Sequence, residues 1–112
     1  MVNKTKLNYV KLITNYIIKN YKNEVKYIIV FGDSINKTIS NPSNLDIAIV
    51  FFNKKNATNY EILGDILGYA GDVVDSGDVT ITPVCNNLSA SYKEAIKNGE
   101  IFYENKEKKT TV

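Results

Sequence analysis

The residues best suited to chemistry in this 112-residue chain lie where one apolar segment ends and another begins. Gly32, Asp33 and Ser34 follow the first segment directly, and Asn44 and Asp46 open the second. A glycine–serine turn after a strand can bind phosphate through its backbone N–H groups. Residues two apart on a strand point to the same face, where carboxylate and amide oxygens can bind a divalent cation. The spacing therefore predicts a phosphate cradle beside a metal site.

The composition excludes several other kinds of chemistry. The chain has no His, which excludes Ser-His-Asp and Cys-His catalysis and zinc sites built on imidazole. All fourteen basic residues are Lys, so no Arg fork is available to bind phosphate with two hydrogen bonds. A net charge of +2 is too small to indicate nucleic-acid binding by itself. The single Cys85 has no base candidate nearby, and we interpret it as a packing residue rather than a nucleophile.

Length and hydropathy predict one domain over residues 1–112, with 106–112 as a polar tail. A hydrophobic content of 44% and a charged content of 23% are typical of a globular protein. Polar residues interrupt the segment 7–18, so it does not read as a signal peptide. No apolar run approaches the roughly 20 residues that a membrane span needs. We therefore expect a cytoplasmic protein that makes no membrane contact.

The hydrophobic periodicity predicts alternating helices and strands. Apolar residues at spacings of three and four predict helices at 5–22, 57–70 and 87–97. Short or alternating apolar runs predict strands at 27–31, 45–52 and 78–84 and a brief edge strand at 101–103.

Some of these segments carry more detailed expectations. The strand at 45–52 is apolar throughout, which predicts burial on both faces. Residues 53–56 are expected to form a polar loop, and Pro83 is expected to end the third strand. The helix after the loop is expected to place Tyr60, Leu63, Leu67 and Ala70 on one apolar side, with Ile62 and Ile66 beside them. The order of elements predicts an α/β fold, a small mixed β-sheet with helices packed chiefly on one face.

Taken together, these motifs resemble the minimal nucleotidyltransferases, small relatives of the DNA polymerase β nucleotidyltransferase fold. Members have a strand ending in Phe-Gly-Ser, about ten further residues, and then Asp-x-Asp at the head of the next strand. Phe31-Gly32 matches the strand end, Asn44-Leu45-Asp46 stands at the Asp-x-Asp spacing, and Asp78 fits a third carboxylate on a later strand. Residues 92–104 are similar to the closing helix and strand of small members, so the resemblance covers about residues 8–104.

The resemblance implies the nucleotidyltransferase fold, a cofactor and a set of site residues. It implies Mg²⁺ bound together with a nucleoside triphosphate, ATP being favoured, and transfer of AMP to a hydroxyl of a partner protein. Small single-domain members often resemble the antitoxin of a pair whose toxin is a HEPN-type RNase. The implied residues are Gly32, Asp33 and Ser34 for nucleotide binding, Asp46 and Asp78 for catalysis, and Asn44, Asp46 and Asp78 for the metal.

Two departures from the family pattern leave the activity open. Asp33 stands where the family has Ser, and its carboxylate would repel phosphate oxygens. Asn44 replaces the first Asp of Asp-x-Asp and brings an amide oxygen without the charge that favours a divalent ion. One hypothesis is an active, Mg²⁺-dependent adenylyltransferase. The alternative is a catalytically inactive binding module with the same fold, which acts through protein–protein contact.

Simpler interpretations of the same residues also remain open. Asp33 and Ser34 can cap a short helix, and Asp78 can be a turn residue after Gly77. Asp72 and Asp75 compete with Asp78 for the third carboxylate position, although Asp78 is preferred because it opens an alternating strand. The sequence does not determine the acceptor, the base preference, the partner or whether the chain associates with itself.

Overall fold

Helices and strands alternate along the part of the chain that the computed structural model describes, which is residues 4–32, 44–74, 78–85, 93 and 97–106. The elements are α1 (Lys4–Tyr21), β1 (Val25–Phe31), β2 (Asn44–Phe51), α2 (Lys54–Ala57), α3 (Tyr60–Val73), β3 (Asp78–Cys85) and β4 (Glu100–Glu104). Most of the helix predicted at 87–97 and the tail after residue 106 lie outside the described residues.

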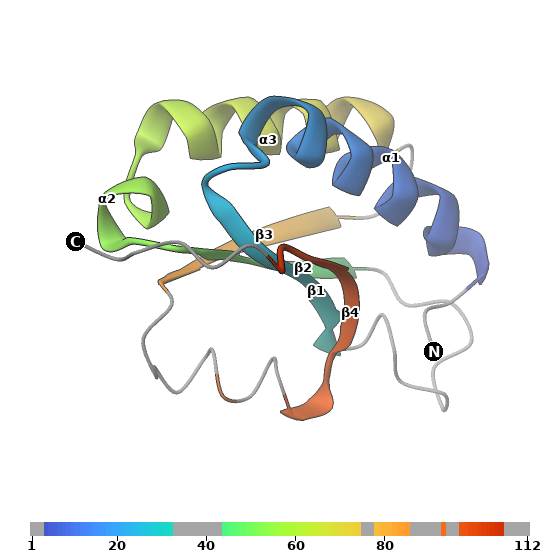
Figure 1. Ribbon diagram of the computed structural model, residues 1–112. Helices are drawn as coiled ribbons and strands as arrows, with labels where there is room; N and C mark the ends of the chain where they lie inside the picture. Colours follow the sequence, from blue (N-terminus) through green and yellow to red (C-terminus); the bar gives the residue numbers. More distant parts are fainter. Residues whose placement is uncertain (1–3, 33–43, 75–77, 86–92, 94–96, 107–112) are drawn as a thin grey trace.

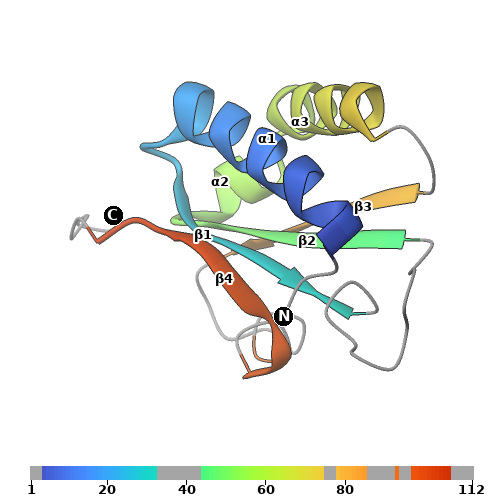
Figure 2. The same cartoon turned by 90° about the vertical axis from the view of Figure 1, so that its right-hand side faces the viewer.

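Within the described residues the strands form one mixed sheet in the order β3-β2-β1-β4. β1 is antiparallel to both β2 and β4, whereas β2 and β3 are parallel and are joined through α2 and α3. The helices α1 and α3 lie side by side over one face of the sheet (Figures 1 and 2). The predicted α/β class, with a small mixed sheet and helices on one face, is therefore confirmed.

The main core lies between the helices and the sheet. It is built from apolar side chains whose spacing is helical on α1 and α3 and alternating on β2. These include Val10, Ile13, Ile17, Leu45, Ile47, Ile49, Phe51, Ile66 and Ala70. A second buried cluster of Ile29, Ala48, Val50 and Val84 lies on the opposite face of the sheet. The predicted burial of β2 on both faces is confirmed.

The segment between β2 and β3 differs from its prediction. Residues 54–57 form the short helix α2 instead of a loop, because the Asn53 side chain accepts a hydrogen bond from the Asn56 N–H at 3.0 Å and Ala57 packs into the core. The next helix begins at Tyr60, where the Asn59 side chain caps two backbone N–H groups.

The orientation predicted for α3 is wrong for Tyr60, which is 88% exposed, and for Leu67, which is 47% exposed. Ala70 and Ile66 are buried as expected, and Leu63 and Ile62 pack against the core. The strand β3 runs past Pro83, its expected end, to Cys85. A proline is tolerated there because β3 lies at an edge of the described sheet, where one side of the strand needs no ladder hydrogen bonds.

A carboxylate on α3 ties that helix to α1. The Tyr16 hydroxyl donates to Asp65 Oδ1 at 2.8 Å, and the Tyr21 hydroxyl donates to Asp65 Oδ2 at 2.5 Å. The Tyr16 ring also stacks on Tyr69, with ring centroids 4.0 Å apart. The bonds from Tyr21 and Tyr16 lower the pKa of Asp65 from 3.8, while desolvation and the bond to Asp65 raise the pKa of Tyr21 to about 12.

This pairing predicts a pH dependence that Asp65→Asn should remove. Because the folded-state pKa of Asp65 is lowered, its stabilising effect is present above pH 3.8 and is lost as the pH falls through the folded-state pKa. Because the folded-state pKa of Tyr21 is raised, its effect is present below pH 10 and is lost as the pH rises through about 12. Urea unfolding should therefore show a wild-type advantage over Asp65→Asn at neutral pH that shrinks in acid. Asp72→Asn, which removes another exposed carboxylate of α3, is the control; an equal loss in both variants would contradict the assignment.

Candidate functional site

The turn after β1 approaches the first residues of β2 closely. Phe31, the last residue of β1, pairs with Asp46 of β2, and Gly32 follows with a positive φ of 71°. A Cβ atom built on Gly32 would lie 2.6 Å from Asp46 Oδ2, closer than such atoms come in proteins. Gly32 therefore serves two needs, because only glycine adopts this backbone readily and only glycine leaves room for the carboxylate. Two of the predicted site residues, Gly32 and Asp46, are thus brought together.

Side chains at the start of β2 and β3 form a short chain of hydrogen bonds. Asn44 Nδ2 donates to Asp46 Oδ1 at 2.7 Å. The Thr80 hydroxyl of β3 donates to Asn44 Oδ1 at 3.3 Å. The Asp46 carboxylate thus has one oxygen hydrogen-bonded to Asn44 and the other against the Gly32 turn.

The alternation of β2 places this cluster on the sheet face that α1 and α3 do not cover. Leu45 and Ile47 belong to the helix-side core, whereas Ala48 belongs to the cluster on the opposite face. Asn44 and Asp46 lie four and two residues before Ala48, so their side chains point to the same face of β2, and both are partly buried. The cluster therefore lies at the end of the sheet where β1 ends and where β2 and β3 begin.

The other predicted site residues are only partly described. The backbone of Asp78 pairs with Asn44 in the parallel register of β2 and β3, which sets it beside the cluster, but its side chain is outside the described part. Asp33 and Ser34 lie outside the described residues, as does Asp75. Asp72, one of the alternatives for the third carboxylate, lies exposed on α3 in the helical layer.

The donor set decides how well the cluster suits Mg²⁺, which prefers oxygen ligands in octahedral geometry. Asp46 supplies a carboxylate, whereas Asn44 turns its amide nitrogen toward Asp46 and its oxygen toward Thr80. Among the described residues no group of three or more His, Cys, Asp or Glu side chains is suited to a metal ion. Among the described side chains of the cluster, Asp46 is therefore the one carboxylate.

Thr80 is the member of the cluster that sequence reasoning missed. It contacts Asn44 because β2 and β3 run parallel with Asn44 paired to Asp78 and Asp46 paired to Thr80. The alternating strand that begins at Asp78 was visible in the sequence, but its register against β2 was not. Had the two strands been aligned by their first polar residues, Thr80 would have fallen beside Asp46.

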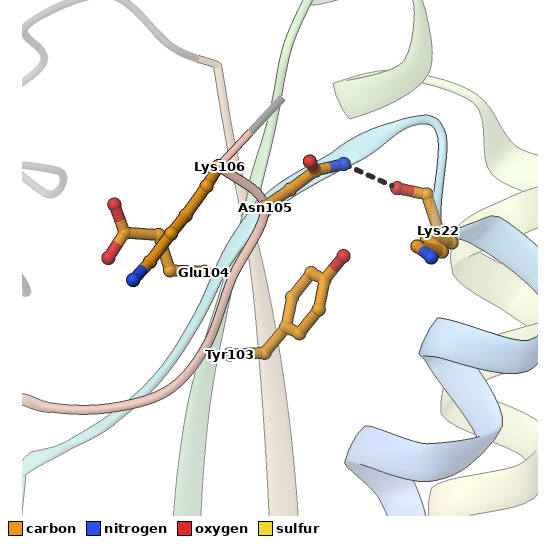
Figure 3. Close-up of a pocket in the computed structure, with 5 residues that line it drawn as sticks. All are labelled: Lys22, Tyr103, Glu104, Asn105 and Lys106. Atoms are coloured by element: carbon orange, nitrogen blue, oxygen red, sulfur yellow. Dashed lines mark hydrogen bonds between the residues drawn. The ribbon is translucent and has the colours of Figure 1, made fainter. Parts of the chain in front are cut away.

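A pocket of about 420 Å³ lies at the other end of β1, and none of the predicted site residues lines it. Its lining residues are Lys22, Tyr103, Glu104, Asn105 and Lys106 (Figure 3). Asn105 is buried there: its Nδ2 donates to the Lys22 carbonyl at 3.1 Å, and its backbone N–H donates to the Lys26 carbonyl at 2.8 Å. These bonds fasten the chain after β4 to the connection between α1 and β1, which gives Asn105 a structural role.

The fold assigns the chain to a structural class. The described chain is a small α/β protein with a mixed sheet and helices packed on one face (Figure 1). A crystal structure of a protein from Shewanella oneidensis has a similar fold, with a TM-score of 0.55 and 14% sequence identity, over 86% of this chain and 71% of that one. No protein-family model and no curated protein sequence matches the chain. In the described residues no helix is both long and apolar enough to cross a bilayer.

Proposed function

We propose that this chain is a nucleotidyltransferase-like protein that binds a nucleoside triphosphate, ATP being favoured, at the junction of Gly32 and Asp46. The close approach of the Gly32 backbone to the Asp46 carboxylate carries the proposal. A glycine turn beside an acidic side chain is the combination that a phosphate–cation pair requires, because such a turn can offer backbone N–H groups to phosphate and a carboxylate can bind a cation. Ser34, two residues after Gly32, can add a hydroxyl donor to the phosphate side of the site, whereas the Asp33 carboxylate opposes phosphate there.

In the proposed reaction the protein transfers AMP to a partner protein. A hydroxyl oxygen of the partner attacks the α-phosphorus, the bond from that phosphorus to the oxygen that bridges it to the β-phosphorus breaks, pyrophosphate leaves, and the hydroxyl proton passes to a site carboxylate or to water. Asp46 and Asp78 would hold Mg²⁺ through their carboxylates, and Asn44 holds Asp46 in place. Bound Mg²⁺ would neutralise the charge that develops on the phosphates. The proposed partner is a HEPN-type toxin, for which this chain would be the antitoxin.

The second candidate is a binding module without catalysis, which neutralises its partner by contact alone. The hydrogen bond from Asn44 to Asp46 favours it, because that bond uses the amide group where the family has a second carboxylate. In such a module the Gly32–Asp46 junction has a structural role and no catalytic one. Removal of the Asp46 carboxylate would then leave partner binding intact.

Titration calorimetry tests nucleotide binding. We expect weak binding of Mg²⁺ alone and tighter binding of Mg²⁺ with ATP, because the triphosphate supplies the missing ligand oxygens. Asp46→Ala should weaken Mg²⁺–ATP binding by about tenfold or more, since a charged ligand at such a site contributes more than the 1.4 kcal/mol that equals a factor of ten. Asp72→Ala removes an exposed carboxylate from α3 and should bind like wild type. Tight Mg²⁺ binding without nucleotide, or equal binding by Asp46→Ala, would contradict the proposal.

A further inference from the structure

Asn44 and Asp46 are so close that two carboxylates at these positions would need a cation or a shared proton between them. The Asn44 nitrogen lies 2.7 Å from Asp46 Oδ1, so a carboxylate at position 44 would bring two negative charges into contact in a partly buried place. Such a pair repels strongly unless a cation or a shared proton lies between the groups. The Asn44 amide instead presents the positive end of its dipole to Asp46 and forms a charge-assisted hydrogen bond.

Asp46 and Thr80 contact the two ends of the Asn44 amide. Its hydroxyl donates to Asn44 Oδ1 at 3.3 Å, so the amide oxygen is occupied on the side away from the carboxylate. The opposite amide orientation would set an oxygen against a carboxylate oxygen, which is repulsive. Because a carboxylate only accepts hydrogen bonds, Asp46 selects the orientation with the NH₂ group toward it, and the Thr80 hydroxyl holds the other end of the amide.

We propose that Asn44 replaces a cation in this site, so that its amide, held at its other end by Thr80, positions Asp46 in the absence of any bound ion. Asn44 and Thr80 are thus positioning residues, and the Asp46–Gly32 contact is assembled before a ligand arrives. The inference deepens the proposed function, because it concerns the same junction, but it is a statement about the ligand-free protein and needs no nucleotide for its test.

The test is thermal unfolding with Mg²⁺ and with a chelator, for wild type and Asn44→Asp. The wild-type Tm should be the same in both conditions. Asn44→Asp should unfold at a lower temperature in chelator and gain about 4 °C or more when Mg²⁺ is added, since the ion then relieves the carboxylate pair. Asn44→Ala and Thr80→Val lose the contacts without adding charge, so both should lower the Tm with no response to Mg²⁺. A wild-type Tm that rises with Mg²⁺, or an Asn44→Asp Tm that does not, would overturn the proposal.

A second measurement uses wild type, so it stands even where Asn44→Asp does not fold. The Asn44 side-chain NH₂ signal in the NMR spectrum is identified by its loss in Asn44→Ala. It should exchange with solvent more slowly than the NH₂ signals of exposed asparagines such as Asn15, and should not shift on addition of Mg²⁺. Fast exchange, or a shift with Mg²⁺ alone, would show that the amide does not hold Asp46. Failure of nucleotide binding in calorimetry would leave both measurements unchanged, so the two proposals fail separately.

Discussion

Gly32→Ala should lower the free energy of unfolding by about 2 kcal/mol and abolish Mg²⁺–ATP binding. The left-handed backbone at Gly32 costs a residue with a side chain about 1–2 kcal/mol. In addition, the new Cβ would lie 2.6 Å from Asp46 Oδ2, so the carboxylate must move. Because Asp46 Oδ1 is bound to Asn44, that movement also strains the hydrogen bond that positions the site. Urea unfolding and calorimetry measure the two effects.

Glycines on α3 provide the matched control. A Cβ atom at Gly64 or Gly68 would meet nothing within 4 Å, and both positions are helical. Gly64→Ala and Gly68→Ala should therefore stabilise the protein by about 0.5–1 kcal/mol each, the difference in helix propensity. A Gly→Ala substitution is thus expected to lower the free energy of unfolding at Gly32 and to raise it on α3. If Gly32→Ala did not lower the free energy of unfolding, the turn would be free to relax. The close approach to Asp46 would then have no structural role.

How far the sequence predicts the fold depends on the length of each pattern. The helix predicted at 5–22 is found as α1 (Lys4–Tyr21), because its apolar stripe repeats over several turns. The four residues of α2 are too few to show a period, and only the capping side chain of Asn53 could have indicated that helix. In α3 nearly every face carries an apolar or small residue, so the sequence indicated Ala70 and Ile66 as buried but could not exclude Tyr60 and Leu67.

Some contacts of the candidate site could also be predicted from the sequence, and others could not. The contact between Gly32 and Asp46 follows from local chain order, since β1 and β2 are consecutive antiparallel strands and the motif lies at their junction. The contact between Asn44 and Thr80 depends on the register of two strands separated by α2 and α3, and composition carries no information about it. The hydrogen bond from Asn44 to Asp46 was open to inference from their spacing, but only the structure distinguishes the amide nitrogen from the amide oxygen as the group that faces Asp46.

Repair of the motif should separate the two functional candidates, through the double variant Asp33→Ser with Asn44→Asp. The first change removes a carboxylate from the proposed phosphate cradle, and the second restores the charge that binds a divalent ion. If the scaffold is that of a degenerate enzyme, Mg²⁺–ATP affinity or AMP transfer to the partner should rise tenfold or more, because neutralising charge at a transferring phosphoryl group contributes several kcal/mol. Labelled ATP follows the transfer, and partner binding is measured in parallel.

The remaining variants give each outcome a distinct meaning. An already active wild type should transfer label, and Asp46→Ala should abolish the transfer. A pure binding module should transfer nothing in any variant, and Asp46→Ala should still bind the partner. The Mg²⁺ response of Asn44→Asp is an internal check, since a repaired site that binds the ion but no nucleotide would restrict the lost function to the phosphate cradle at residues 32–34. Absence of nucleotide binding in every variant, with the fold intact, would mean that the likeness to nucleotidyltransferases is one of architecture alone.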